Sequence, residues 1–159
     1  MITVTRRAYI ETSSPEEVFA VLSDPNRIGN LLPRFHKVEI LNRNMETRTA
    51  RLVTHMSIGG LFGTIRCEGD LTWTEPGEIL FKVRTPVPVE TRWTLSPAVN
   101  GTDIQATMWL DLVPMLGPMA AFVPVQTVSG MLGRELESAL TTIRERSQRN
   151  EIREQAAAA

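Results

Sequence analysis

The feature that most constrains this fold is an amphipathic pattern close to the C-terminus, running from about Pro118 to Arg149. Intervals of four, four, four and three residues separate its apolar positions, Val128, Leu132, Leu136, Leu140 and Ile143. Because an α-helix has about 3.6 residues per turn, these side chains form a single stripe. At about 1.5 Å per residue the predicted helix is roughly 45 Å long. A helix of that length with one apolar face must lie on a broad apolar surface.

Most of the chain before Pro114 alternates apolar and polar residues, as half-buried β-strands do. The first predicted strand covers Ile2 to Glu11. Ser14 and Glu17 then form a capping box, which predicts a short helix, and a second short helix is predicted over Asn26–Leu32. Six further strands are expected within residues 38–112, separated by turn signals such as Gly59-Gly60, Glu75-Pro76-Gly77-Glu78 and Asn100-Gly101.

This order of elements predicts an α+β architecture. We expect a curved seven-stranded antiparallel sheet, two short helices after the first strand, and a long C-terminal helix across the concave face. Short connections favour antiparallel neighbours in a meander. The length of 159 residues suggests one domain, which we place at residues 1–149, followed by a frayed or disordered tail at residues 150–159.

Composition and charge exclude several classes of protein. The formal net charge is −1 and no basic block stands out, so the chain lacks the electrostatic signature of a nucleic-acid-binding protein. Cys67 is the only cysteine, which rules out an intramolecular disulfide. His36 and His55 show no metal-ligand spacing, so we expect neither a metal nor a cofactor. No secretory leader follows Met1, and we expect a cytoplasmic protein.

The alternation places the apolar side chains of the strands on the face that meets the long helix. We expect an apolar ligand to bind between this face and the helix. The inward positions carry no carboxylate, histidine or basic side chain, which argues against acid–base catalysis. No base neighbours Cys67 in the pattern, so we predict no catalytic residue. The predicted ligand-binding set is Leu52, Thr54, Met56, Cys67, Trp73, Phe81, Val83, Thr91, Trp93, Met108, Met119, Phe122, Val128 and Leu132. The opposite face is expected to hold cross-strand ion pairs among Arg66, Glu68, Arg84, Glu90 and Arg92.

One segment, Leu112–Gly133, contains no charged residue. Its 22 residues are enough in principle to span a bilayer, but three prolines, Pro114, Pro118 and Pro124, argue against a membrane-spanning helix. We expect the loop Val113–Val123 to gate the ligand cavity. Residues Met115–Val123 of this loop offer a surface for peripheral contact with a membrane or a partner protein.

Two stretches of the sequence resemble the START-like, or SRPBCC, superfamily. The segment SSPEEVFAVLSDPNRIGNLLP, Ser13–Pro33, is similar to the superfamily's opening: a capped helix with a Val-Phe pair, then Asp-Pro and a second helix that ends in proline. The segment VEIL, Val38–Leu41, matches the strand that usually follows. The resemblance implies a helix-grip fold with a hydrophobic cavity between sheet and long helix. It points to the bacterial polyketide cyclase/dehydrase branch or the coenzyme Q-binding branch.

The residues and the resemblance together favour binding or carriage of a hydrophobic small molecule, such as a lipid, an isoprenoid quinone or a polyketide, without chemistry. One alternative is an enzyme of the polyketide cyclase/dehydratase type. It would need an ionisable group in the cavity, and Arg6, on the apolar side of the first strand, is the best candidate. Another alternative is an accessory subunit that docks on a membrane or partner enzyme through the charge-free segment. The oligomeric state stays open.

Overall fold

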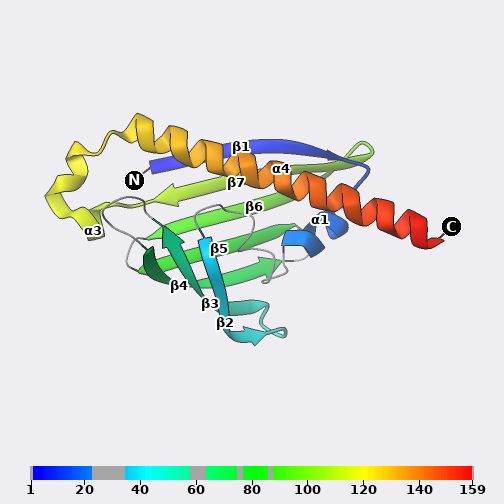
Figure 1. The fold of residues 1–159 in the computed structure, drawn as a ribbon, viewed down its shortest axis with the longest axis horizontal. Helices are drawn as coiled ribbons and strands as arrows, with labels where there is room; N and C mark the ends of the chain where they lie inside the picture. The colour runs from blue at the N-terminus through cyan, green and yellow to red at the C-terminus, as the bar shows by residue number, and fades with distance from the viewer. Residues whose placement is uncertain (1, 23–34, 58–63, 75–76, 86–87, 159) are drawn as a thin grey trace.

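Seven antiparallel strands form one curved sheet, and a long helix lies on its concave side (Figure 1). The structure is a computed structural model that describes residues 2–22, 35–57, 64–74, 77–85 and 88–158. The strands are β1 (Ile2–Glu11), β2 (Phe35–Asn44), β3 (Thr49–Ser57), β4 (Thr64–Thr74), β5 (Glu78–Thr85), β6 (Val89–Ala98) and β7 (Gly101–Leu110). The helices are α1 (Pro15–Leu22), α3 (Val113–Leu116), the 3-10 helix η2 (Gly117–Phe122) and α4 (Val125–Ala158). The predicted α+β helix-grip architecture is confirmed.

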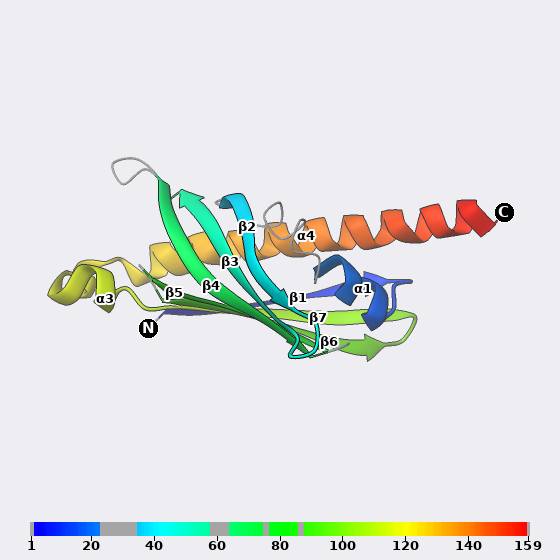
Figure 2. The same cartoon turned by 90° about the horizontal axis from the view of Figure 1, so that it is seen from below.

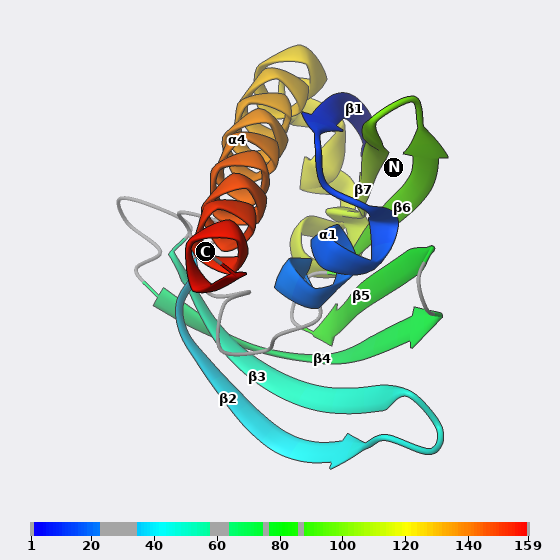
Figure 3. The same cartoon turned by 90° about the vertical axis from the view of Figure 1, so that its right-hand side faces the viewer.

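The strand order is β1-β7-β6-β5-β4-β3-β2, with every neighbouring pair antiparallel. Strands β2 to β7 follow one another as the predicted meander, and β1 completes the sheet beside β7. Figure 3 looks along α4 and shows the sheet curving around α1 and α4. The curvature leaves β1 and β2 as the two edges of an open sheet.

The predicted helix cap at Ser14 and the predicted turn at Asn100 are both seen in the described residues. The Ser14 hydroxyl accepts a hydrogen bond from the Glu17 backbone N–H at 3.3 Å, so Ser14 caps α1 as expected. Asn100 takes a left-handed conformation, with φ of 56°, in the tight turn between β6 and β7. The predicted second helix, Asn26–Leu32, and the Gly59-Gly60 turn lie outside the described residues.

The long helix begins later than the sequence pattern suggests. It starts at Val125 and not at Pro118, because the chain between them folds differently. Gly117 has a left-handed φ of 57° and begins the 3-10 helix η2. Val123 is extended immediately before Pro124. The helix also continues past Arg149 to Ala158. Whether residues 150–159 fray in solution stays a prediction.

The apolar stripe of α4 packs inward as expected. Leu132, Leu136, Leu140 and Ile143 are buried, and Val128 is half-buried at the start of the stripe. The helix packs on β1 and on α1, which lies beneath its C-terminal half (Figure 2). Val18, Phe19 and Leu22 of α1 join the same core as the concave side chains of the sheet. Burying both helices against one face therefore creates one continuous apolar interior.

The outer face of the sheet is polar and carries cross-strand ion pairs. Arg51 lies 3.5 Å from Glu68, and Arg84 lies 3.2 Å from Asp70. Arg92 of β6 lies 3.7 Å from Glu78 on the neighbouring strand β5 and 3.7 Å from Glu90 on its own strand. Its guanidinium lies 5.5 Å from the ring centre of Trp109. These pairs are all partly exposed, so each contributes about 0–1 kcal/mol. Charge pairing on this face confirms which side of the sheet meets water.

Ile40 of β2 shows that a concave position can still be exposed at the edge of the sheet. It pairs with the buried Leu52 of β3, so it lies on the concave face, yet it is 40% exposed. Since β2 is an edge strand, no further strand covers this position.

Candidate functional site

The concave face of the sheet gathers most of the predicted ligand-binding residues into one buried, uncharged surface. Strands β3 to β7 contribute Leu52, Thr54, Cys67, Trp73, Phe81, Val83, Thr91, Trp93 and Met108, all buried. Leu132 of α4 is buried in the same core, and Val128 packs against it. Met56, another member of the predicted set, lies in β3.

The strand register makes these residues direct neighbours. Thr54 lies opposite Cys67 on adjacent strands, so the two side chains share one face. Thr91 lies between Phe81 on one side and Met108 on the other. Two polar hydroxyls are therefore set into an apolar surface that spans five strands.

Two members of the predicted set lie elsewhere. Met119 and Phe122 belong to η2, where their side chains are 62% and 80% exposed. A continuous helix from Pro118 would place them near the stripe that starts at Val128, but the 3-10 helix turns them outward. With Val113 and Val125 they are the exposed large apolar residues of the segment that runs from α3 to the start of α4. We call these four residues the apolar patch.

A cleft opens beside that patch, between the ends of β1 and β7 and the α3–η2 segment. Its volume is about 360 Å³. The lining consists of Ile2, Leu110, Asp111, Leu112, Val113, Gly117, Pro118, Ala120, Ala121, Val123 and Val125. Leu110 and Leu112 also pack against the buried core, so the cleft reaches the edge of the apolar interior. We call it the end cleft. The sequence pattern missed it because it depends on how the α3–η2 segment folds back.

Cys67 is a neutral thiol in this setting. It is buried, and burial raises the pKa of the Cys67 thiol above its usual value. A thiol held protonated is a poor nucleophile and a poor metal ligand. Among the described residues, no group of three His, Cys, Asp or Glu side chains is arranged to hold a metal ion.

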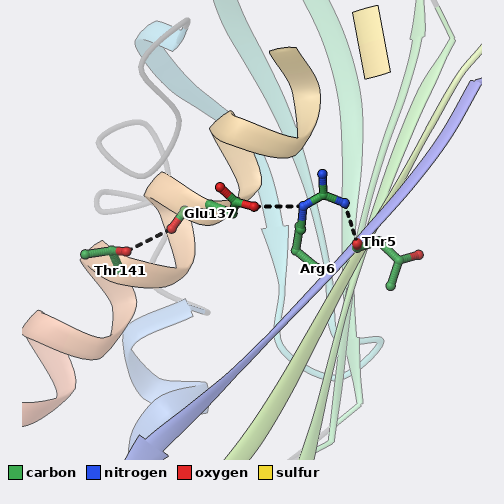
Figure 4. Close-up of polar contacts among 4 residues, drawn as sticks. All are labelled: Thr5, Arg6, Glu137 and Thr141. Atoms are coloured by element: carbon green, nitrogen blue, oxygen red, sulfur yellow. Dashed lines mark hydrogen bonds and ion pairs between the residues drawn. The ribbon is translucent and has the colours of Figure 1, made fainter. Parts of the chain in front are cut away.

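Arg6 is the ionisable residue that the sequence suggests as the candidate for a cyclase reaction. In the structure it pairs with Glu137 of α4. Figure 4 shows its guanidinium reaching from β1 toward the helix, where Nε donates to Glu137 Oε1 at 3.0 Å. Nη1 donates to the Thr5 carbonyl oxygen at 2.8 Å. The guanidinium also lies against Gly133, whose missing side chain leaves room for it. The side chains of Arg6 and Glu137 are 37% and 60% exposed, so the pair sits at the margin between β1 and α4.

Solved structures with the same fold include proteins of several bacteria. A protein from Thermus thermophilus matches with a TM-score of 0.73 and 19% identity, covering 93% of this chain and 98% of that one. A START superfamily protein from Mycobacterium smegmatis matches with a TM-score of 0.69 and 19% identity, over 92% and 97% of the two chains. The Zhui aromatase/cyclase of a Streptomyces species matches with a TM-score of 0.70 and 14% identity, over 92% and 93%. At these identities the likeness shows the fold alone.

Family membership comes from the sequence comparison. No curated protein matches the chain significantly. The family model described as polyketide cyclase/dehydrase and lipid transport, however, matches residues 1–148, nearly the whole chain. This agrees with the START-like resemblance of Ser13–Pro33 and with the observed helix-grip fold. The chain belongs to the polyketide cyclase/dehydrase and lipid transport family.

Proposed function

We propose that this protein binds and carries an uncharged hydrophobic small molecule between the concave face of the sheet and α4. The observation that carries the proposal is the continuous apolar surface from β3 to β7, in which the described side chains are buried and uncharged. An apolar interior with a few polar groups is the usual setting for small-molecule binding. Lipids, isoprenoid quinones and polyketide-like molecules have the required chemistry.

The charge distribution supports an uncharged ligand. Ion pairs such as Arg51–Glu68 and Arg84–Asp70 lie on the outer face of the sheet. A charged ligand group inside would lose its hydration without gaining an opposite charge, which is strongly unfavourable. The single cysteine, which allows no intramolecular disulfide, fits a reducing compartment, and we place the activity in the cytoplasm.

Carriage without chemistry fits the ionisable groups better than a cyclase reaction does. General acid–base catalysis needs a titratable group within hydrogen-bond reach of the substrate. Arg6 is tied to Glu137 at the margin, and the neutral Cys67 thiol has no base described beside it. If the protein is instead a cyclase, Arg6→Ala should abolish turnover of an identified polyketide substrate, whereas full turnover would remove Arg6 as the catalytic group.

Peripheral docking on a membrane is a second candidate function, and the apolar patch favours it. Val113, Met119, Phe122 and Val125 are each more than half exposed, beside a cleft that reaches the interior. No helix in the described part of the chain is long and apolar enough to cross a membrane. Co-sedimentation with phosphatidylcholine vesicles tests this function. Met119→Asp with Phe122→Asp should abolish it, whereas Val99→Asp, at an exposed valine in the β6–β7 turn, should not.

Native mass spectrometry of the purified protein, followed by solvent extraction, tests the main proposal. We expect a stoichiometric lipophilic mass that organic solvent removes. An apo protein that also fails to bind added lipophilic compounds would contradict the proposal, because a carrier of hydrophobic molecules must bind them.

A further inference from the structure

One buried hydroxyl on the described concave face has no hydrogen-bond partner. The Thr54 side chain is 1% exposed, and its Oγ1 makes no hydrogen bond. Two other buried hydroxyls in the described part of the chain share this property, but Ser13 precedes α1 and Ser147 lies on α4. Of these three, Thr54 alone belongs to a strand of the sheet and to the predicted ligand-binding surface.

Two other buried threonines of this fold are satisfied by the protein itself. Thr102 is fully buried, and its hydroxyl donates to the Ser13 carbonyl oxygen at 2.7 Å. Thr107 pairs with the Thr5 hydroxyl at 3.1 Å. A buried hydroxyl without a partner is unfavourable, and valine has nearly the same shape without that cost. The hydroxyl at position 54 therefore contributes nothing visible to the fold itself.

The surroundings of Thr54 define what could satisfy it. The register places Cys67 of β4 opposite Thr54 on one side and Val38 of β2 opposite it on the other. Leu52 lies two residues earlier on the same face of β3. Leu52 is apolar, and a neutral thiol is only a weak donor or acceptor. A ligand group that meets Thr54 there would find one strong hydrogen-bonding partner within an apolar wall.

We propose that Thr54 is the polar recognition residue of this interior, and that its ligand carries an uncharged oxygen, a carbonyl or a hydroxyl, within an apolar body. This inference rests on the proposed function and narrows its ligand class. A threonine hydroxyl donates to a carbonyl and either donates to or accepts from a hydroxyl. Pure hydrocarbons would leave the hydroxyl unsatisfied. Carboxylates would bring a charge to a surface whose described side chains from β3 to β7 are uncharged, and Arg6 of β1 is already paired with Glu137.

A matched pair of probes tests the inference. Methyl naphthyl ketone and isopropenylnaphthalene have almost the same shape, but the first carries a C=O group where the second carries C=CH₂. We would measure the Kd of each by fluorescence titration for the wild type, Thr54→Val and Thr54→Ser. Comparing the ratio of the two Kd values between variants cancels the difference in hydrophobicity between the probes, because that difference is the same for every variant.

The wild type should favour the ketone, relative to the alkene, by about three- to tenfold more than Thr54→Val does. Thr54→Ser keeps the hydroxyl and should retain the preference, which separates the hydroxyl from side-chain shape. Thr107→Val, on the outer face of β7, is the control and should leave the ratio unchanged. Equal ratios in wild type and Thr54→Val would overturn this inference alone. Failure of both probes to bind the wild type would overturn the proposed function together with it.

Discussion

A methyl group added at Gly133 would test how α4 rests on β1. Gly133 is buried in the helix, and a Cβ built there would lie 2.8 Å from Arg6 Cζ and 3.2 Å from Arg6 Nε. These separations are too short, so the guanidinium would have to leave the helix surface. Its 3.0 Å ion pair with Glu137 would then be lost. Because the guanidinium ends a flexible side chain, we expect the helix itself to stay in place.

Two opposing contributions determine the free energy of unfolding of Gly133→Ala. Alanine is favoured over glycine within a helix by about 1 kcal/mol. Losing a partly exposed ion pair costs about 0.2–1 kcal/mol, and displacing the guanidinium adds to that cost. We therefore expect a net change within about 0.5 kcal/mol of zero in the wild type, since the two contributions nearly cancel. In an Arg6→Ala background the same substitution should stabilise by about 1 kcal/mol.

Gly130 provides a matched control one turn away. A Cβ there would meet only Arg134 Nη1, at an ordinary 3.6 Å, so Gly130→Ala should stabilise by about 1 kcal/mol in either background. Urea unfolding followed by far-UV circular dichroism gives the midpoints for the full set of variants. If Gly133→Ala stabilised the wild type as much as Gly130→Ala does, the contact between Arg6 and α4 would be refuted.

Three further experiments test separate parts of the structure. Thr54→Val should leave stability unchanged or raise it, whereas Thr102→Val should destabilise by about 1 kcal/mol in urea unfolding, because only Thr102 loses a hydrogen bond. A loss of stability in Thr54→Val equal to that in Thr102→Val would contradict this contrast. Ser14→Ala should cost about 1 kcal/mol in the same assay through loss of the α1 cap, and an unchanged midpoint would argue against that cap. Cys67 should react with iodoacetamide at pH 8 far more slowly when folded than in urea, because burial disfavours the thiolate and raises its pKa; equal rates would show an accessible thiol.

The fold could be predicted largely because its signals are local and periodic. The alternation of strands, the helix cap at Ser14 and the Asn100-Gly101 turn each act within a few residues, and each is present in the structure. The start of α4 could not be predicted in the same way. The stripe that begins at Val128 is helical in period, but Gly117 and Pro124 set the local backbone before it.

The candidate site was predicted where it depends on strand parity and missed where it depends on tertiary packing. Parity places Thr54, Cys67 and Trp93 on one face, and the register then makes a single surface of them. The end cleft and the fit of Arg6 against Gly133 need distant segments to meet, and no short-range pattern encodes that. The absence of charge from Leu112 to Gly133 was the one sequence signal near the cleft.

Backbone amide chemical shifts measured while methyl naphthyl ketone is added test the central claim most directly. If the interior binds hydrophobic molecules, saturable one-to-one shifts should appear at concave positions such as Leu52, Cys67 and Trp93. Shifts confined to the apolar patch, at residues such as Met119 and Phe122, would contradict the account, and so would the absence of any saturable shift.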